Sequence, residues 1–186
     1  DRALENAEKA VKLDKSSATA LARLGWIKLY FKSHEEGLKN IERAAELNPN
    51  NGEIIFLHGA VLNYTGQAEK ALDTLQFAVE VDAFVPPTWD THMGLANLLL
   101  GKYEAAITAL DRSIERAPEY LPGYLFRAWA QVENGEPRDA ENDIVTILKN
   151  IPDCSIESMT QMLPFQSKKV SESLAKALRI AGLPES

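Results

Sequence analysis

The sequence has 186 residues, of which 45% are hydrophobic and 25% are charged, a balance typical of a folded globular chain. Its 27 acidic and 20 basic residues give a net charge of −7 without a basic cluster, so we predict no nucleic-acid partner. No apolar run approaches the ~20 residues of a membrane span and no basic amphipathic helix occurs, so we predict no membrane contact. One cysteine, Cys154, excludes an internal disulfide framework and favours a reducing compartment, which predicts a cytoplasmic protein.

In chain order, the apolar spacing predicts a series of short amphipathic helices joined by turns. Residues 1–17 hold one such helix, and four helix–turn–helix units follow at 18–51, 52–85, 86–120 and 121–153. The regular spacing fades in residues 154–186, which predict a degenerate helix and then a capping helix. Because the first helix corresponds to the second half of a unit, we expect another helix upstream in a longer parent protein.

Small residues recur at the same place in each unit. In the first helices they are separated by 34, 35 and 34 residues, at Gly25, Gly59, Gly94 and Ala128. In the second helices they are Ala3, Gly37, Ala71, Ala106 and Ala140. Small residues let two helix backbones approach closely, and Leu110 can fill the space beside Gly94 and Ala106. The period and the small residues together predict hairpins that stack on one another.

These features resemble the tetratricopeptide repeat, a helix–turn–helix unit with the pattern W-x2-L-G-x2-Y…A-x3-F…P. Leu21, Leu24 and Gly25 match its opening triad with Leu in place of Trp, and Pro49, Pro118 and Pro152 match its terminating proline. The resemblance covers roughly residues 1–153. It implies an all-α, right-handed superhelix (an α-solenoid) whose first helices line a concave surface.

On that concave surface we predict an apolar, aromatic groove that binds a peptide or a helix. Four-residue steps place its candidate residues on one face of successive first helices. They are Trp26, Tyr30, Phe56, Tyr64, Leu95, Leu99, Leu125 and Trp129. Aromatic anchors in a concave surface are typical of peptide recognition. For any single ring, packing between helices is the competing interpretation.

We predict no catalytic residue, no metal site and no cofactor. His58 and His92 lack a cysteine or carboxylate at metal-ligand spacing, and partly buried structural imidazoles are the simpler interpretation. Asp90, Thr91 and His92 are adjacent, but no recognised catalytic motif accompanies them. Cys154 has no nearby histidine or basic residue to lower its thiol pKa. The fragment is therefore not expected to be an enzyme.

The C-terminal residues carry a narrower resemblance. Residues 162–165 (MLPF), a capping helix and residues 181–185 (AGLPE) are similar to the C-termini of bacterial multidomain regulators. Those proteins join such arrays to a class III adenylate/guanylate cyclase domain or to a winged-helix DNA-binding domain. The resemblance implies a C-terminal regulatory part of a signalling protein, with a protein, a peptide or an upstream domain of the parent chain as its partner. The alternative is a self-association module that forms a homodimer and so pairs an upstream domain.

Overall fold

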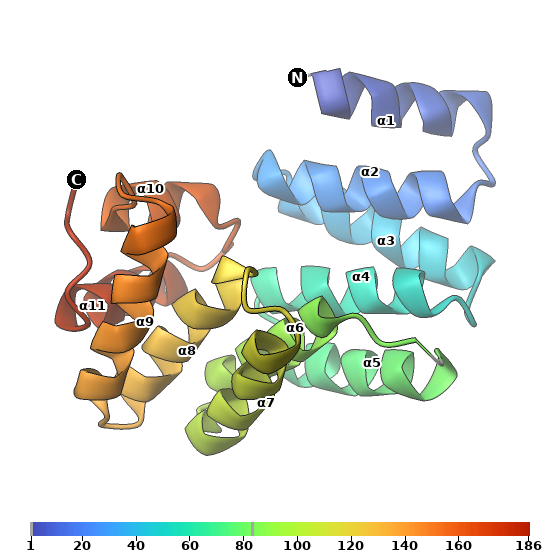
Figure 1. The fold of residues 1–186 in the computed structure, drawn as a ribbon. Helices are drawn as coiled ribbons and strands as arrows, with labels where there is room; N and C mark the ends of the chain where they lie inside the picture. Colours follow the sequence, from blue (N-terminus) through green and yellow to red (C-terminus); the bar gives the residue numbers. More distant parts are fainter. Residues whose placement is uncertain (1, 83) are drawn as a thin grey trace. The chain divides into compact units, whose positions relative to one another are not determined.

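The computed structural model describes residues 2–82 and 84–186, and every regular element in them is an α-helix (Figure 1). This confirms the predicted all-α class. The described residues divide into two compact units, Asp1–Val85 and Pro86–Ser186, and each is treated by itself below. No helix in the described part of the chain is both long enough and apolar enough to cross a membrane.

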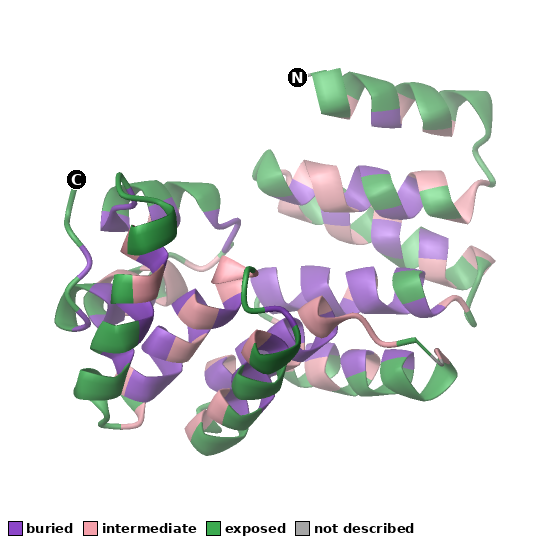
Figure 2. Ribbon diagram, in the orientation of Figure 1, coloured by how far each residue is buried: buried purple, intermediate pink, exposed green. Residues whose placement is uncertain are grey.

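The described residues of the first unit form five helices: α1 (Arg2–Leu13), α2 (Ala18–Tyr30), α3 (His34–Leu47), α4 (Gly52–Tyr64) and α5 (Ala68–Val81). Two of them begin at side-chain caps, since the Ser17 side chain accepts a hydrogen bond from the Ala20 amide (3.3 Å) and Asn51 accepts one from Ile54 (3.0 Å). The α2–α3 and α4–α5 pairs form antiparallel hairpins, and α4 is buried along most of its length (Figure 2).

The second unit contains six helices: α6 (Pro87–Leu99), α7 (Tyr103–Arg116), α8 (Leu121–Glu133), α9 (Pro137–Asn150), α10 (Ile156–Met162) and α11 (Lys168–Ile180). Pro87 and Pro137 stand at the first helical position, where the missing amide costs nothing. The hairpins are α6–α7 and α8–α9, and α11 packs against α8 and α10.

Close backbone approach explains the small residues at the hairpin seams. A Cβ added to Gly94 would lie 2.5 Å from Cγ of Leu110, and one added to Gly59 would lie 2.6 Å from Cγ of Leu75. The prediction that Leu110 fills the space beside Gly94 is therefore correct. Ala106 is fully buried in the same seam. These contacts leave no room for a larger side chain. The small residues that recur in each repeat therefore determine how closely the two helices of each pair approach.

The turn inside each hairpin needs a left-handed backbone. The residue at this place is Lys32, Gly66, Gly101 or Gly135, with φ of 59°, 80°, 72° and 85°. Glycine adopts this conformation without the steric cost that a Cβ adds, so three of the four turns use it. Lys32 is the non-glycine residue that adopts it among the described residues.

The C-terminal segment closes on itself. The α10 amide of Ile156 donates to the Pro184 carbonyl (2.8 Å), and that of Glu157 donates to the Glu185 carbonyl (3.1 Å). Arg179 binds the Glu185 carboxylate through Nε and through Nη2, the latter at 3.0 Å. The tail thus satisfies amides at the start of α10 that have no partner within the helix. Ser167 is the N-cap of α11, although its side chain makes no capping hydrogen bond there.

Candidate partner-binding cleft

The eight residues predicted to line the groove fall into two sets. Five are buried, with exposed fractions of at most 8%: Phe56, Tyr64, Leu95, Leu125 and Trp129. Trp26 and Leu99 are half-buried, and Tyr30 is 43% exposed. These five side chains pack among the helices of the free chain. That the eight residues together line a partner-binding groove stays a prediction.

In the first unit the aromatic residues form one cluster. The Trp26 ring meets Tyr30 at 5.3 Å and Tyr64 at 6.3 Å, both edge to face. This is the favourable geometry for aromatic pairs, and it joins α2 to α4. Tyr64 therefore fits the packing interpretation, while Tyr30 keeps an exposed edge. Burial raises the pKa of the Tyr30 phenol, so it stays a neutral hydrogen-bonding group at physiological pH.

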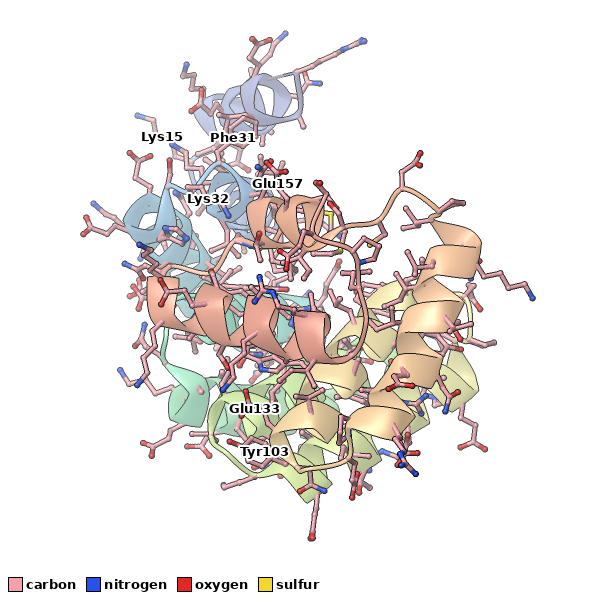
Figure 3. The ribbon with its side chains drawn as sticks, turned by 90° about the vertical axis from the view of Figure 1, so that its left-hand side faces the viewer. Lys15, Phe31, Lys32, Tyr103, Glu133 and Glu157 are labelled. Atoms are coloured by element: carbon pink, nitrogen blue, oxygen red, sulfur yellow. The ribbon has the colours of Figure 1, made fainter. Side chains whose placement is uncertain are left out.

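In the second unit the structure contains a cleft of about 510 Å³. Its walls come from the end of α6, the following turn, the end of α8 and the start of α11. The lining residues are Leu98, Leu99, Leu100, Gly101, Tyr103, Trp129, Glu133, Lys169, Val170 and Ser173. Tyr103 and Glu133, both on its wall, are labelled in Figure 3. Leu99 and Trp129 of the predicted groove therefore meet here.

Contacts with the C-terminal segment hold the cleft wall in place. The Trp129 indole donates from Nε1 to Oγ of Ser173 (3.3 Å), and that hydroxyl donates to Oε1 of Glu133 (2.9 Å). The indole also meets the Phe165 ring edge to face at 6.0 Å. Trp129 is thus fixed between α8 and the C-terminal segment. The cleft lining thus combines apolar residues with the charged side chains of Glu133 and Lys169.

Of the ten residues that line this cleft, the predicted groove contains only Leu99 and Trp129. Tyr103 and Val170 were not among the predicted residues. Ser173 carried no signal at all, because a lone serine on a polar helix face is usually solvated. The period of the repeats extends only to about residue 153, so it contains no information about where α11 packs.

The adjacent residues Asp90, Thr91 and His92 take structural roles. Asp90 accepts hydrogen bonds from Nη1 of Arg116 (2.8 Å) and Nε of Arg112 (3.2 Å), and Thr91 shares one with Ser113 (2.6 Å). Burial lowers the pKa of His92 to about 4, so its imidazole is neutral at physiological pH. These interactions join α6 to α7.

Two further features bear on chemistry. Cys154 is buried, and burial raises the pKa of its thiol, which opposes a nucleophilic role. In residues 2–82 and 84–186, no group of three or more His, Cys, Asp or Glu side chains could hold a metal ion.

Comparison with known proteins gives the family. Models described as tetratricopeptide repeat match residues 18–51 and 56–122. Together these segments make up more than half of the 186 residues. The chain therefore contains tetratricopeptide repeats, the class that builds protein-interaction scaffolds.

Three solved structures share the fold. PilW, a type IV pilus biogenesis factor, is 17% identical, with a TM-score of 0.72 over 94% of this chain and 78% of its own. YrrB, whose description is a TPR protein with an unusual peptide-binding site, is 24% identical, with a TM-score of 0.59 over 82% of this chain and 78% of its own. MamA from Desulfovibrio magneticus RS-1 is 20% identical, with a TM-score of 0.63 over 81% of this chain and 86% of its own.

A curated relative is the BBSome complex member BBS4 of Bos taurus, which is 25% identical over 118 residues. The match covers 63% of this chain and only 22% of BBS4.

Proposed function

We propose that this chain is a protein-interaction module and that the cleft in residues 86–186 binds a peptide segment of its partner. The observation that carries the proposal is the cleft itself, about 510 Å³ in volume, with Trp129 fixed in its wall by Ser173 and Phe165. A preformed, mostly apolar concavity with a few placed polar groups is the usual form of a ligand site. A rigid site also loses little conformational entropy on binding.

The residues that line the cleft indicate which side chains a bound peptide should carry. Leu99 and Val170 offer apolar contact, and Trp129, although 3% exposed, belongs to the same wall, so the central residue of the ligand should be aliphatic or aromatic. Glu133 and Lys169 at the edge can pair with charges or with backbone amides and carbonyls on either side of it. The description of YrrB as a protein with a peptide-binding site supports a peptide as the ligand class.

A peptide-display selection on the intact chain tests the proposal. Enriched peptides should contain an apolar residue, and one synthesised peptide should shift the NMR signals of the Trp129 indole and of Ser173. The exposed aromatic edge at Tyr30 serves as an internal comparison, since a peptide bound there would shift the Trp26 indole instead. Absence of enrichment, or shifts confined to Trp26, would rule out the cleft as the peptide site.

Two narrower hypotheses concern the parent protein and self-association. A cyclase-linked or winged-helix-linked parent, with an upstream domain as partner, depends on the resemblance of residues 162–185, and none of the relatives named above is described as such a regulator. Self-association into a homodimer depends on the exposed apolar surface of the first helix, where Leu13 is 80% exposed. Light scattering on the intact chain tests self-association, and a monomeric mass would eliminate it.

A cytoplasmic location stays a prediction, and we assign no reaction to the chain.

A further inference from the structure

A second surface hollow lies in the first unit, on a different set of helices. It is a groove of about 350 Å³ between α3 and α5, with α4 as its floor. Its lining residues are Ala45, Pro49, Ile55, His58, Asp73, Thr74 and Phe77. Phe77 is 44% exposed although it is a large apolar side chain. The groove therefore combines an exposed aromatic face with a carboxylate, that of Asp73.

The repeat places an arginine at the corresponding position of the second unit. Counted from the start of their helices, His58 of α4 and Arg127 of α8 occupy the same position. Arg127 binds the Asp143 carboxylate through Nε (2.9 Å) and Nη2 (2.6 Å), and Asp111 through Nη1 (2.5 Å). Its Cζ also lies 5.7 Å from the centre of the Tyr124 ring. A guanidinium between two carboxylates, beside an aromatic ring, thus occupies this place between α7 and α9.

The first unit has carboxylates and an aromatic ring near the corresponding position, but no arginine. Glu42 of α3 corresponds to Asp111 of α7, and it acts electrostatically on His58. Thr74 of α5 corresponds to Asp143 of α9, and the neighbouring Asp73 supplies a carboxylate in the groove wall. Phe77 supplies an aromatic face. The anion and the ring that suit a guanidinium are therefore present, and the arginine is replaced by a shorter side chain.

The charge of the nearby groups suits a cation. Burial lowers the pKa of His58, so its imidazole is uncharged at neutral pH and does not repel a cation. Lys70 also acts on His58, but its ammonium donates to Oε1 of Gln67 at 3.2 Å. Asp73 lines the groove and Glu42 acts on His58, so these two carboxylates carry two negative charges against the one positive charge of Lys70.

We propose that the groove between α3 and α5 binds an arginine side chain presented by a partner polypeptide. The guanidinium lies on the Phe77 ring and pairs with the Asp73 carboxylate of the groove wall, and Glu42, which is not a lining residue, adds negative charge near His58. Arginine fits better than lysine because its planar group both stacks on an aromatic ring and binds carboxylates with several donors. This site is independent of the cleft in residues 86–186.

The test is an NMR titration of the whole chain with a blocked pentapeptide, acetyl-Ala-Ala-Arg-Ala-Ala-amide. The control peptide carries citrulline, which has nearly the shape of arginine but no charge. We expect saturable shifts of the His58 and Phe77 ring signals with the arginine peptide, and about tenfold weaker binding of the citrulline peptide. Equal binding of the two peptides, or no saturable shift at these rings, overturns the proposal.

Two variants make the test specific. Asp73→Asn, at an exposed position, should weaken binding of the arginine peptide about tenfold without affecting the fold. The double variant His58→Arg/Thr74→Asp copies Arg127 and Asp143 into the first unit, so it should fill the groove and abolish binding. Its control is His34→Arg/Thr108→Asp, which makes the same substitutions away from the groove and should bind like the wild type. Wild-type affinity of either groove variant contradicts the proposal.

Discussion

Gly25 and Gly37 face each other across the α2–α3 seam so closely that a Cβ on Gly25 would lie 2.7 Å from the carbonyl oxygen of Gly37. The opposing atom belongs to the backbone, so it cannot move without shifting a helix. At the equivalent α6–α7 seam, a Cβ on Gly94 would instead meet the side chain of Leu110. Both seams are built from small residues. The Gly25 contact is with backbone atoms and the Gly94 contact is with a side chain, so the α6–α7 seam can adjust to a larger residue more easily.

This difference predicts unequal costs for the same substitution. Gly25→Ala should lower the free energy of unfolding by about 2–3 kcal/mol, because overpacking against backbone forces the helices apart. Gly94→Ala should cost less, about 1–2 kcal/mol, because the atom it meets belongs to a side chain, which must repack but does not require the helix to shift. Urea denaturation of both variants measures the difference. Equal costs would mean that the α2–α3 seam is not closed as the structure has it.

The α6–α7 seam predicts a second pair of outcomes. Ala106 is fully buried there, while its neighbour Ala105 is exposed. Ala106→Glu should cost more than about 4 kcal/mol or prevent folding, because it places a charge and extra volume in a closed seam. Ala105→Glu should change stability by less than about 0.5 kcal/mol. An unchanged melting temperature for Ala106→Glu would show that the seam is misplaced.

The ion network of Arg127 predicts that its two carboxylates contribute unequally. The Asp143 side chain is 3% exposed and that of Asp111 is 52% exposed. Asp143→Ala should cost about 2–3 kcal/mol, because it leaves a half-buried guanidinium without its bidentate partner. Asp111→Ala should cost less than about 1 kcal/mol, as is usual for an exposed pair. Chemical denaturation tests the order, and a larger effect at Asp111 would be inconsistent with this network.

His92 predicts a pH dependence of stability. Burial lowers its pKa to about 4 in the folded chain, from an ordinary value of 6.5. The unfolded chain therefore binds the proton more tightly, so this contribution to stability is complete above pH 6.5 and is lost as the pH falls toward 4.

Urea unfolding at about pH 7 and about pH 4.5 measures the effect. Because carboxylates also titrate in this range, the informative quantity is the difference between the wild type and His92→Gln. The wild type should lose roughly 2 kcal/mol more stability than the variant between the two pH values. The same loss in both chains would mean that His92 is accessible to solvent.

The repeat period predicted the fold because the small residues it contains act locally. Gly25, Gly59 and Gly94 each determine the contact inside one hairpin, and Lys32, Gly66, Gly101 and Gly135 each determine one turn. Their effect needs no knowledge of distant parts of the chain. The helix pairs therefore follow from spacing and residue size, whereas the left-handed turn at Lys32 does not, because lysine carries a Cβ.

The cleft could not be predicted in the same way, because it depends on packing between segments that the period does not relate. Trp129 was expected to project into an open groove, and it is 3% exposed because Phe165 and Ser173 cover it. The last helix lies outside the repeat register, so its contact with α8 has no counterpart in the earlier units. The burial of Asp143 beside Arg127 was not predicted either, because a charged side chain on the second helix of a repeat is usually solvated.

The most direct test of the peptide-binding cleft is the dissociation constant of the selected peptide, measured by calorimetry on two variants. Leu99→Ala removes apolar surface from the cleft wall, and Val145→Ala removes it from the 65%-exposed Val145 side chain on α9. We predict about tenfold weaker binding for Leu99→Ala and unchanged binding for Val145→Ala. Equal dissociation constants for the two variants would contradict the assignment of the cleft as the peptide site.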